Sequence, residues 1–174
     1  MLRNEKGYRK DKNMKCLVFS DSHGNNSLLS RALMKHPDAE VVFFLGDGLS
    51  DVSDLAALDN KRMWIAVKGN CDFSGIFMGR VVDKTEEITL MGKKIVATHG
   101  DLYNAKYGTE GLVSLARSRG ADVVLFGHTH VRHEEYIDGE HPFYLFNPGS
   151  ASSPSYSYGI LTLDENYILL SHGY

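Results

Sequence analysis

The sequence predicts an α/β domain in which two mixed β-sheets pack face to face and helices cover their outer faces. Two patterns in the 174 residues support this prediction. In the first half of the chain, short runs of β-branched and aromatic residues alternate with amphipathic helical segments, as in βαβα units. In the second half, pairs of apolar runs are separated by short turn sequences, which is typical of β-hairpins.

The first half of the chain contains three apolar runs that are fit for strands buried on both faces, because polar residues do not alternate with the apolar ones. An amphipathic segment follows each of the first two runs. The first of these segments ends before Pro37, which cannot continue a helix. We predict strands at residues 16–20, 41–45 and 63–67 and helices at residues 27–35 and 49–58.

The second half begins with a hairpin whose turn contains Gly92, and glycine suits the positive φ of such turns. A helix follows, and Gly120 lies just after it, where a helix C-terminus favours glycine. One buried strand and two more hairpins complete the chain. The predicted hairpins join 87–90 to 94–98, 135–137 to 143–146 and 160–163 to 167–170, with the helix at 109–119 and the strand at 123–126.

Length and composition restrict the class of protein. A chain of 174 residues fits one domain, and a hydrophobic content of 43% can build its core without disulfides or a structural metal. The net charge of −3 argues against a general electrostatic grip on nucleic acid or an anionic membrane, so no stable nucleic-acid complex is expected. No apolar stretch approaches the roughly 18 residues of a membrane span.

The cysteines and the N-terminus favour a cytoplasmic protein. Only Cys16 and Cys71 occur, and Cys16 lies in an apolar run, which is the cysteine usage of a reducing compartment. The N-terminal residues are polar and mostly basic and lack the apolar segment of a secretory signal. We predict that residues 1–13 form a disordered extension and residues 14–174 a single domain, and that Met14 could be the natural start.

Residues that can bind a metal ion follow five of the predicted strands. Ligands of open α/β sheets gather at the carboxyl ends of strands, and glycines there permit tight turns. Each short motif is weak alone, since Gly-Asp and Gly-Asn are ordinary turn dipeptides and a single histidine is most often structural. The five motifs are Asp21-Ser22-His23, Gly46-Asp47, Gly69-Asn70-Cys71-Asp72, His99-Gly100 and Gly127-His128-Thr129-His130.

Together, the motifs supply the donors that a two-metal site requires. Two divalent ions about 3.5–4 Å apart need a bridging carboxylate to offset their repulsion, and neutral imidazole and amide ligands that leave positions open. Such a donor set favours manganese, iron, nickel, cobalt or zinc over magnesium or calcium, and manganese is the first expectation among them. The predicted metal ligands are Asp21, His23, Asp47, Asn70, His99, His128 and His130.

In this order, the five motifs resemble the pattern of the calcineurin-like metallophosphoesterase superfamily, which reads D-x-H, G-D, G-N-[HC]-[DE], H-G and G-H-[TS]-H. The resemblance covers about residues 14–174 once Asn147-Pro148-Gly149-Ser150 is included. The short length and the motif sequences are most similar to the small YfcE-like phosphodiesterase branch, which shares its fold with the retromer scaffold subunit. The resemblance implies a four-layer α/β/β/α sandwich.

The resemblance also implies a role for each candidate residue. A hydroxide lying between the ions would attack phosphorus in line with the leaving alkoxide, and Asn70 would help to stabilise the charge on the phosphoryl oxygens. The activity implied is hydrolysis of a phosphate ester, first of all a phosphodiester. Asp21, His23 and His130 would bind one ion, Asn70, His99 and His128 the other, and Asp47 would bridge both.

Two positions depart from the family pattern. Larger relatives carry a histidine after the Gly-Asn pair, where it can protonate the leaving group, whereas this chain has Cys71, whose thiol has an ordinary pKa of about 8.5. If neither Cys71 nor Asp72 replaces that histidine, good leaving groups are favoured; Asp72 is expected as a helper behind the metal ligands. Ser155 stands where many close relatives have an arginine, so a candidate phosphate-binding cation is missing.

Three functions stay open from the sequence. Phosphodiester hydrolysis is the first, and the same donors would serve a phosphomonoesterase acting on nucleotides or sugar phosphates. A non-catalytic interaction scaffold, as in the retromer subunit, is the third, although a module without chemistry should have lost some of the seven donors. The expected partners are a small phosphate ester or nucleotide and no membrane, with a homo-oligomer left open.

Overall fold

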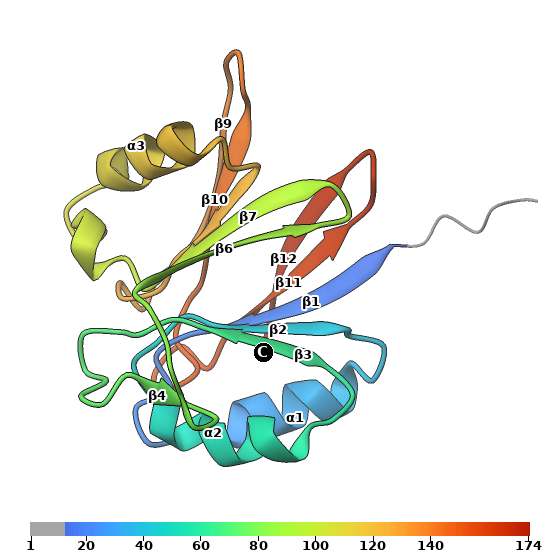
Figure 1. Ribbon diagram of the computed structural model, residues 1–174, viewed down its shortest axis with the longest axis vertical. Coiled ribbons are helices and arrows are strands. Elements are labelled where there is room, and N and C mark those ends of the chain that lie inside the picture. The colour runs from blue at the N-terminus through green and yellow to red at the C-terminus, as the bar shows by residue number, and fades with distance from the viewer. Residues whose placement is uncertain (1–12) are drawn as a thin grey trace, which may run out of the picture.

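The elements of the protein form four layers, which are visible edge-on in the computed structural model (Figure 1). The structure describes residues 13–174, so the predicted extension at residues 1–13 lies outside the described residues except for Asn13. Two five-stranded sheets pack against each other, and helices lie on the outer side of each sheet. The predicted α/β/β/α sandwich is therefore confirmed.

The first sheet has the strand order β12-β11-β1-β2-β3 and combines the two ends of the chain. Its three N-terminal strands are parallel, because helical connections carry the chain back across the sheet each time. The C-terminal hairpin extends the sheet by antiparallel pairing of β11 with β1 and of β12 with β11. The elements are β1 (Met14–Phe19), α1 (Ser27–Lys35), β2 (Val41–Phe44), α2 (Leu49–Leu58), β3 (Met63–Ala66), β11 (Tyr158–Leu163) and β12 (Ile168–Gly173).

The second sheet has the order β6-β7-β8-β10-β9 and is also mixed. β8 pairs in parallel with β7 and with β10, whereas the hairpins β6-β7 and β9-β10 are antiparallel. Met91 and Gly92 both have positive φ in the β6-β7 turn, as the predicted hairpin requires. The elements are β6 (Thr85–Leu90), β7 (Lys93–Thr98), α3 (Glu110–Arg119), β8 (Val123–Leu125), β9 (Arg132–Ile137) and β10 (Phe143–Pro148).

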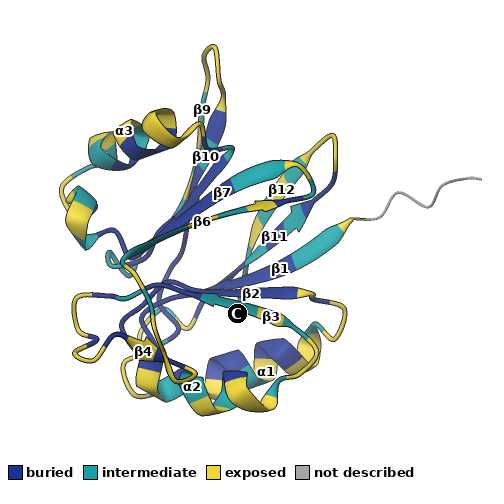
Figure 2. Cartoon of the chain, in the orientation of Figure 1, coloured by how far each residue is buried: buried dark blue, intermediate teal, exposed yellow. Residues whose placement is uncertain are grey.

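Burial explains why the strands β1 and β2 (Figure 2), and likewise β8, read as continuous apolar runs. Successive residues of a strand point to opposite faces, and both faces of these strands are covered. In β1, Leu17 and Phe19 pack toward α1 and α2, while Cys16 and Val18 pack between the two sheets. In β8, Val124 packs toward α3, while Val123 and Leu125 face the first sheet.

The predicted helices and strands are found with small changes at their ends. The helices at 27–35 and 49–58 have the predicted bounds, and the third begins at Glu110 with Gly120 in a left-handed conformation at its end. Two features were not predicted: the short hairpin of β4 (Ile76–Phe77) and β5 (Arg80–Val81), and the 3-10 helix Asp101–Tyr103. Both are too short to show a periodic pattern in the sequence.

Within residues 13–174, no helix combines the length and the apolar character needed to cross a membrane.

Leucine-to-alanine substitutions should distinguish the central core from the surface. Leu161 lies between the sheets and is fully buried, whereas Leu58 at the end of α2 is 84% exposed. We expect Leu161→Ala to lower the free energy of unfolding by about 2–5 kcal/mol, because it removes buried methyl groups and leaves a cavity. Leu58→Ala is the matched control and should change it by less than about 0.5 kcal/mol. Urea denaturation followed by circular dichroism measures both, and equal effects would contradict the assigned core.

Candidate metal centre

The strand ends that carry the five motifs meet at one edge of the sandwich. The carboxyl ends of β1, β2 and β3 are adjacent because these strands are parallel, and the same holds for β7 and β8. Within the first sheet, Asp21 N–H donates to the Gly46 carbonyl over 3.0 Å. Between the sheets, His128 N–H donates to Asp21 Oδ2 over 3.1 Å. Loops far apart in the sequence are thus hydrogen-bonded to one another.

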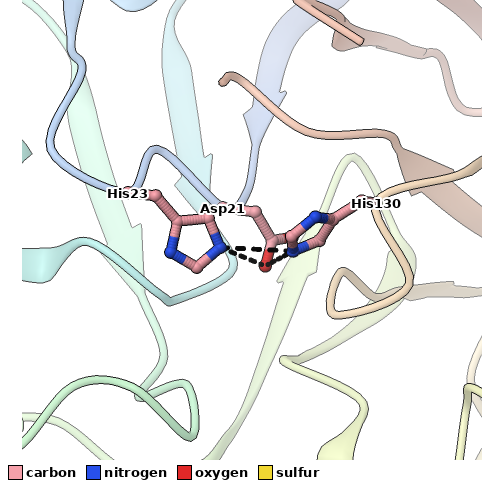
Figure 3. Close-up of side chains that lie close together, drawn as sticks. All are labelled: Asp21, His23 and His130. Atoms are coloured by element: carbon pink, nitrogen blue, oxygen red, sulfur yellow. Dashed lines mark hydrogen bonds and ion pairs between the residues drawn. The ribbon is translucent and has the colours of Figure 1, made fainter. Parts of the chain in front are cut away.

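Asp21, His23 and His130 form the first group of donors (Figure 3). The Nε2 atoms of the two imidazoles face each other at 3.2 Å, and Asp21 Oδ1 lies 3.2 Å from that of His130 and 3.8 Å from that of His23. Asp21 is fully buried, yet within residues 13–174 its Oδ1 has only these two contacts with imidazole nitrogens and receives no hydrogen bond. A divalent cation would satisfy such a buried oxygen flanked by imidazole nitrogens.

His99 lies at the centre of a second group. Its Nδ1 lies 2.8 Å from the Leu45 carbonyl, which can only accept, so Nδ1 carries the proton and the neutral ring points its Nε2 lone pair into the site. Around Nε2 lie Asn70 Oδ1 at 3.1 Å, His128 Nδ1 at 3.2 Å and Asp47 Oδ2 at 3.3 Å. The oxygens are acceptors, so lone pairs converge on one point, where a positive charge is required.

Asp47 connects the two groups. Its carboxylate lies within 4.8 Å of donors of Asp21 and His99, and also within 4.8 Å of donors of His23 and Cys71. The residue is only 3% exposed, so it faces the other donors rather than solvent. A carboxylate placed between two sets of donors is what two adjacent divalent ions need as a bridge.

The site concentrates negative charge, as the pKa values of its residues indicate. Burial tends to raise the pKa of Asp47, but contact with the His99 ring and a hydrogen bond from the Cys71 backbone N–H outweigh it and hold the pKa below its ordinary value. Burial tends to lower the pKa of His99, but the Asp47 carboxylate raises it overall. The adjacent Asp21 carboxylate likewise raises the pKa of His130. The pKa values of both histidines are therefore raised by neighbouring carboxylates, and the same negative charge would attract a metal cation.

The backbone of the site is strained. The left-handed region is unfavourable for residues with a Cβ, at about 1–3 kcal/mol each, and such strain gathers at functional sites. It persists only where the surrounding structure imposes it. Five of the seven candidate ligands have positive φ: Asp21 (57°), His23 (44°), Asp47 (58°), His128 (66°) and His130 (61°).

Two glycines of the motifs allow the loops after β2 and β3 to touch. A Cβ added to Gly46 would overlap the backbone of Gly69, and one added to Gly69 would overlap Asp47. Neither clash could be relieved by a side-chain rotation, because backbone or a buried carboxylate is in the way. The glycines beside Asp47 and Asn70 are therefore required by the close approach of the loops that place these two residues.

Comparison with known proteins identifies the family of this chain. The family model of the calcineurin-like phosphoesterase superfamily domain matches residues 14–166. The chain belongs to this superfamily. Membership supports a phosphoesterase activity and implies divalent metal ions, and it confirms the resemblance found from the five motifs.

Individual metallophosphoesterases support the assignment. The probable metallophosphoesterase YsnB of Bacillus subtilis is 35% identical over 158 residues, which cover 88% of this chain and 86% of YsnB. YfcE, a phosphoesterase from E. coli, has a similar structure, with a TM-score of 0.62, 26% identity and coverage of 85% of this chain and 88% of YfcE. Vacuolar Protein Sorting 29 from Cryptosporidium parvum shares the fold, with a TM-score of 0.73, 18% identity and coverage of 94% and 98%.

Asp72 stabilises the backbone of the loops that carry the candidate metal ligands. Its two carboxylate oxygens accept hydrogen bonds of 2.8–2.9 Å from the backbone N–H groups of Asp47, Gly48, Leu49 and Gly69. Two of these donors belong to the start of α2, whose first N–H groups lack partners within the helix. The side chain is 9% exposed and fixes the loop that carries Asp47.

Two further supports lie in the Asn147-Pro148-Gly149-Ser150 segment, which begins within the last residues of β10. Asn147 Nδ2 donates to the Gly127 carbonyl over 2.8 Å, and Ser150 Oγ donates to the Asp21 carbonyl over 2.9 Å. No individual role was predicted for these residues, although the segment directly follows the predicted strand 143–146 and belongs to the family pattern. Both side chains are fully buried and hold the loops that carry Asp21 and His128.

All of the sequence-predicted site residues lie at this edge of the sandwich. The seven candidate ligands are linked through the contacts above, Cys71 is exposed beside Asp47, and Asp72 lies beneath the Asp47 loop. The donor set fits the divalent ions that the family implies, because a carboxylate oxygen with no hydrogen-bond donor in residues 13–174 and several converging lone pairs would all be satisfied by a positive charge.

Asp72→Asn should destabilise the fold and loosen metal binding. The amide retains one acceptor oxygen and places N–H groups against backbone N–H groups, so we expect a loss of about 2–4 kcal/mol in unfolding free energy. Metal affinity should fall about 10–100-fold, as for other residues that orient ligands. Chemical denaturation and calorimetric titration with Mn²⁺ measure the two effects. Asp54→Asn, on the exposed face of α2, is the matched control and should change neither.

Proposed function

We propose that this chain is a metal-dependent phosphodiesterase that hydrolyses a small phosphate ester or nucleotide. The observation that carries the proposal is the convergence of lone pairs around His99 Nε2, with Asp47 shared between two groups of donors. Family membership supports the same chemistry. Asn70, His99 and His128 would hold one divalent ion, Asp21, His23 and His130 the other, and Asp47 would bridge them.

The ions would supply the chemistry, and the chain would position it. When bound, two divalent ions lower the pKa of a water molecule and offset the charge on a phosphoryl group. The Leu45 carbonyl fixes the ring of His99 through the 2.8 Å contact with Nδ1, so the lone pair of Nε2 stays available to bind a metal ion. Asn70 points Oδ1 toward His99 and its amide N–H toward Cys71, which leaves that N–H near the open side of the site, where a phosphoryl oxygen would lie.

Cys71 is the candidate for protonating the leaving group, and it is a weak acid for this task. The neighbouring Asp47 carboxylate raises the pKa of its thiol above the ordinary value. The thiol therefore keeps its proton at neutral pH but releases it reluctantly. Asp72 is ill placed for the same role, because its oxygens are occupied by backbone N–H groups. Good leaving groups should consequently react fastest.

The metals proposed are manganese first, with iron, nickel, cobalt or zinc as alternatives; a set with four imidazoles and an amide favours these transition metals over magnesium or calcium. The cellular location proposed is the cytoplasm, where free thiols such as those of Cys16 and Cys71 stay reduced.

A diester is preferred over a monoester because the site offers few cations for the second charge of a monoester. Ser155 stands in place of the expected arginine, and its hydroxyl donates to the His130 carbonyl. Lys106 is the lysine whose charge acts on both His128 and His130, and it is exposed. Because its positive charge could offset the second negative charge of a monoester, Lys106 is the observation that favours the alternative, monoester hydrolysis.

An interaction scaffold is the candidate from another class. The fold is shared with Vacuolar Protein Sorting 29, and large apolar side chains are exposed in the loops that carry the motifs. Phe73 is 100% exposed, Tyr107 90% and Val131 65%, and these residues follow the third, fourth and fifth motifs, respectively. Such side chains could instead contact the organic groups of a substrate, so activity measurements must decide.

Removing a proposed ligand should abolish hydrolysis without unfolding the protein. We expect Asp47→Asn and His99→Ala to lower kcat/KM more than about 100-fold, since even residues that only orient ligands contribute about 10–100-fold. The assay is release of 4-nitrophenol from an aryl phosphodiester with Mn²⁺, with circular dichroism as the check of folding. His141→Ala, an exposed histidine away from the motifs, is the control. A metal-loaded wild type inactive on every phosphate ester would favour the scaffold.

Substrate preference separates the two hydrolase hypotheses. With Mn²⁺, kcat/KM for bis(4-nitrophenyl) phosphate should exceed that for 4-nitrophenyl phosphate by about tenfold or more, a difference of about 1.4 kcal/mol in activation free energy. Lys106→Ala should lower turnover of the monoester more than that of the diester, because the monoester carries the additional charge. A strong preference of the wild type for the monoester would make the protein a phosphomonoesterase instead.

A further inference from the structure

Cys71 is part of a third group of potential donors that extends beyond the predicted ligand set. A ring nitrogen of His23, a carboxylate oxygen of Asp47 and the sulfur of Cys71 all lie within 4.8 Å of one another. A tetrahedral ion with bonds of about 2.0–2.3 Å holds its donors about 3.3–3.8 Å apart, so movements of about 1 Å would bring all three onto one ion. These three residues therefore form a possible three-donor metal site.

The sulfur is held in this position by its neighbours. The backbone N–H of Cys71 donates to Asp47 Oδ1 over 2.7 Å, and Asn70 Nδ2 donates to the Cys71 sulfur over 3.2 Å. Both contacts involve residues that are themselves candidate ligands. A second observation points to a cation in the same centre: the fully buried Asp21 Oδ1 lacks a hydrogen-bond donor within the described part of the chain.

We propose that Cys71 is a direct ligand of thiophilic ions such as Zn²⁺ and Co²⁺, bound together with His23 and Asp47. This inference rests on the metal centre of the proposed function. Sulfur is a soft donor that selects such ions, whereas Mn²⁺ prefers oxygen and nitrogen. On binding, the S–H bond breaks, its proton passes to solvent and a sulfur lone pair is donated to the ion. Cys71 thus biases the centre toward tight zinc or cobalt binding and leaves manganese exchangeable.

Cobalt provides a direct spectroscopic test. Full-length protein freed of metal with a chelator is titrated anaerobically with Co²⁺ and followed by absorption. A cobalt–thiolate bond gives an intense charge-transfer band in the near ultraviolet, in addition to the visible bands that report cobalt binding. We expect both in the wild type, and only the visible bands in Cys71→Ser, which alters one exposed sulfur atom.

The other cysteine supplies the matched control. Cys16 is fully buried in β1 between the sheets and belongs to none of the donor groups. Cys16→Ala should keep the charge-transfer band. Cobalt binding without this band in the wild type, or with the band intact in Cys71→Ser, would overturn the role of Cys71 while leaving the metal centre standing. Absence of any cobalt binding would overturn both proposals.

Thiol alkylation gives an independent readout. Iodoacetamide forms an S–C bond with the exposed Cys71, releasing iodide and the thiol proton, and intact mass spectrometry counts the product. Saturating Zn²⁺ should slow this modification at least about tenfold, whereas Mn²⁺ should slow it far less. Equal alkylation rates with and without bound Zn²⁺ would show that sulfur is not coordinated. In competition titrations, Cys71→Ser should lose about 10–100-fold in Zn²⁺ affinity and change little for Mn²⁺.

Discussion

The position of the Asp47 carboxylate is the constraint on which the rest of the site depends. One oxygen accepts the Cys71 N–H at 2.7 Å and the other lies 3.3 Å from His99, so the residue joins loops that follow β2, β3 and β7. Its own backbone is held in the left-handed region by Asp72, which accepts the Asp47 N–H. The two sheets must therefore pack in one register for the donors to meet, which links the core between them to the chemistry.

Strands and loops contribute differently to this arrangement of donors. The parallel strands deliver their carboxyl ends to one edge, and the apolar core fixes them there. The loops then adopt conformations that no strand or helix would supply. Buried polar side chains hold those loops from behind: Asp72 under Asp47, Ser150 under Asp21 and Asn147 under Gly127. Rigid support of this kind keeps donors in position before an ion arrives, so little ordering remains to oppose binding.

The sequence predicted most of the fold because its strands and helices carry strong periodic or continuous apolar patterns. The bounds of α1 and α2 were predicted correctly, as was the Met91-Gly92 turn. The hairpin of β4 and β5 could not be predicted, because strands of two residues are too short to show an alternation of apolar and polar residues. The candidate ligands, and Asp72 as a helper behind them, could be named from motifs at strand ends, but the hydrogen-bond partners of Asp72 could not. Its four hydrogen bonds reach residues 3 to 25 positions away, and only the packed loops reveal them.

The energetic cost of the site bears on whether the protein is a catalyst or a scaffold. Asp21 and Asp47 are 0% and 3% exposed, and an ionised carboxylate taken out of water costs several kcal/mol unless it is paired. Five left-handed donors add strain of about 1–3 kcal/mol each. A purely structural module would gain stability by replacing these residues, since the apolar core does not need them. A site that keeps buried charges, strained backbone and, among the described residues, a carboxylate oxygen without a hydrogen bond is best explained by a divalent ion that offsets these costs on binding. Under the proposed function, the same residues would serve hydrolysis, because the charge that stabilises the loops would also act on phosphate.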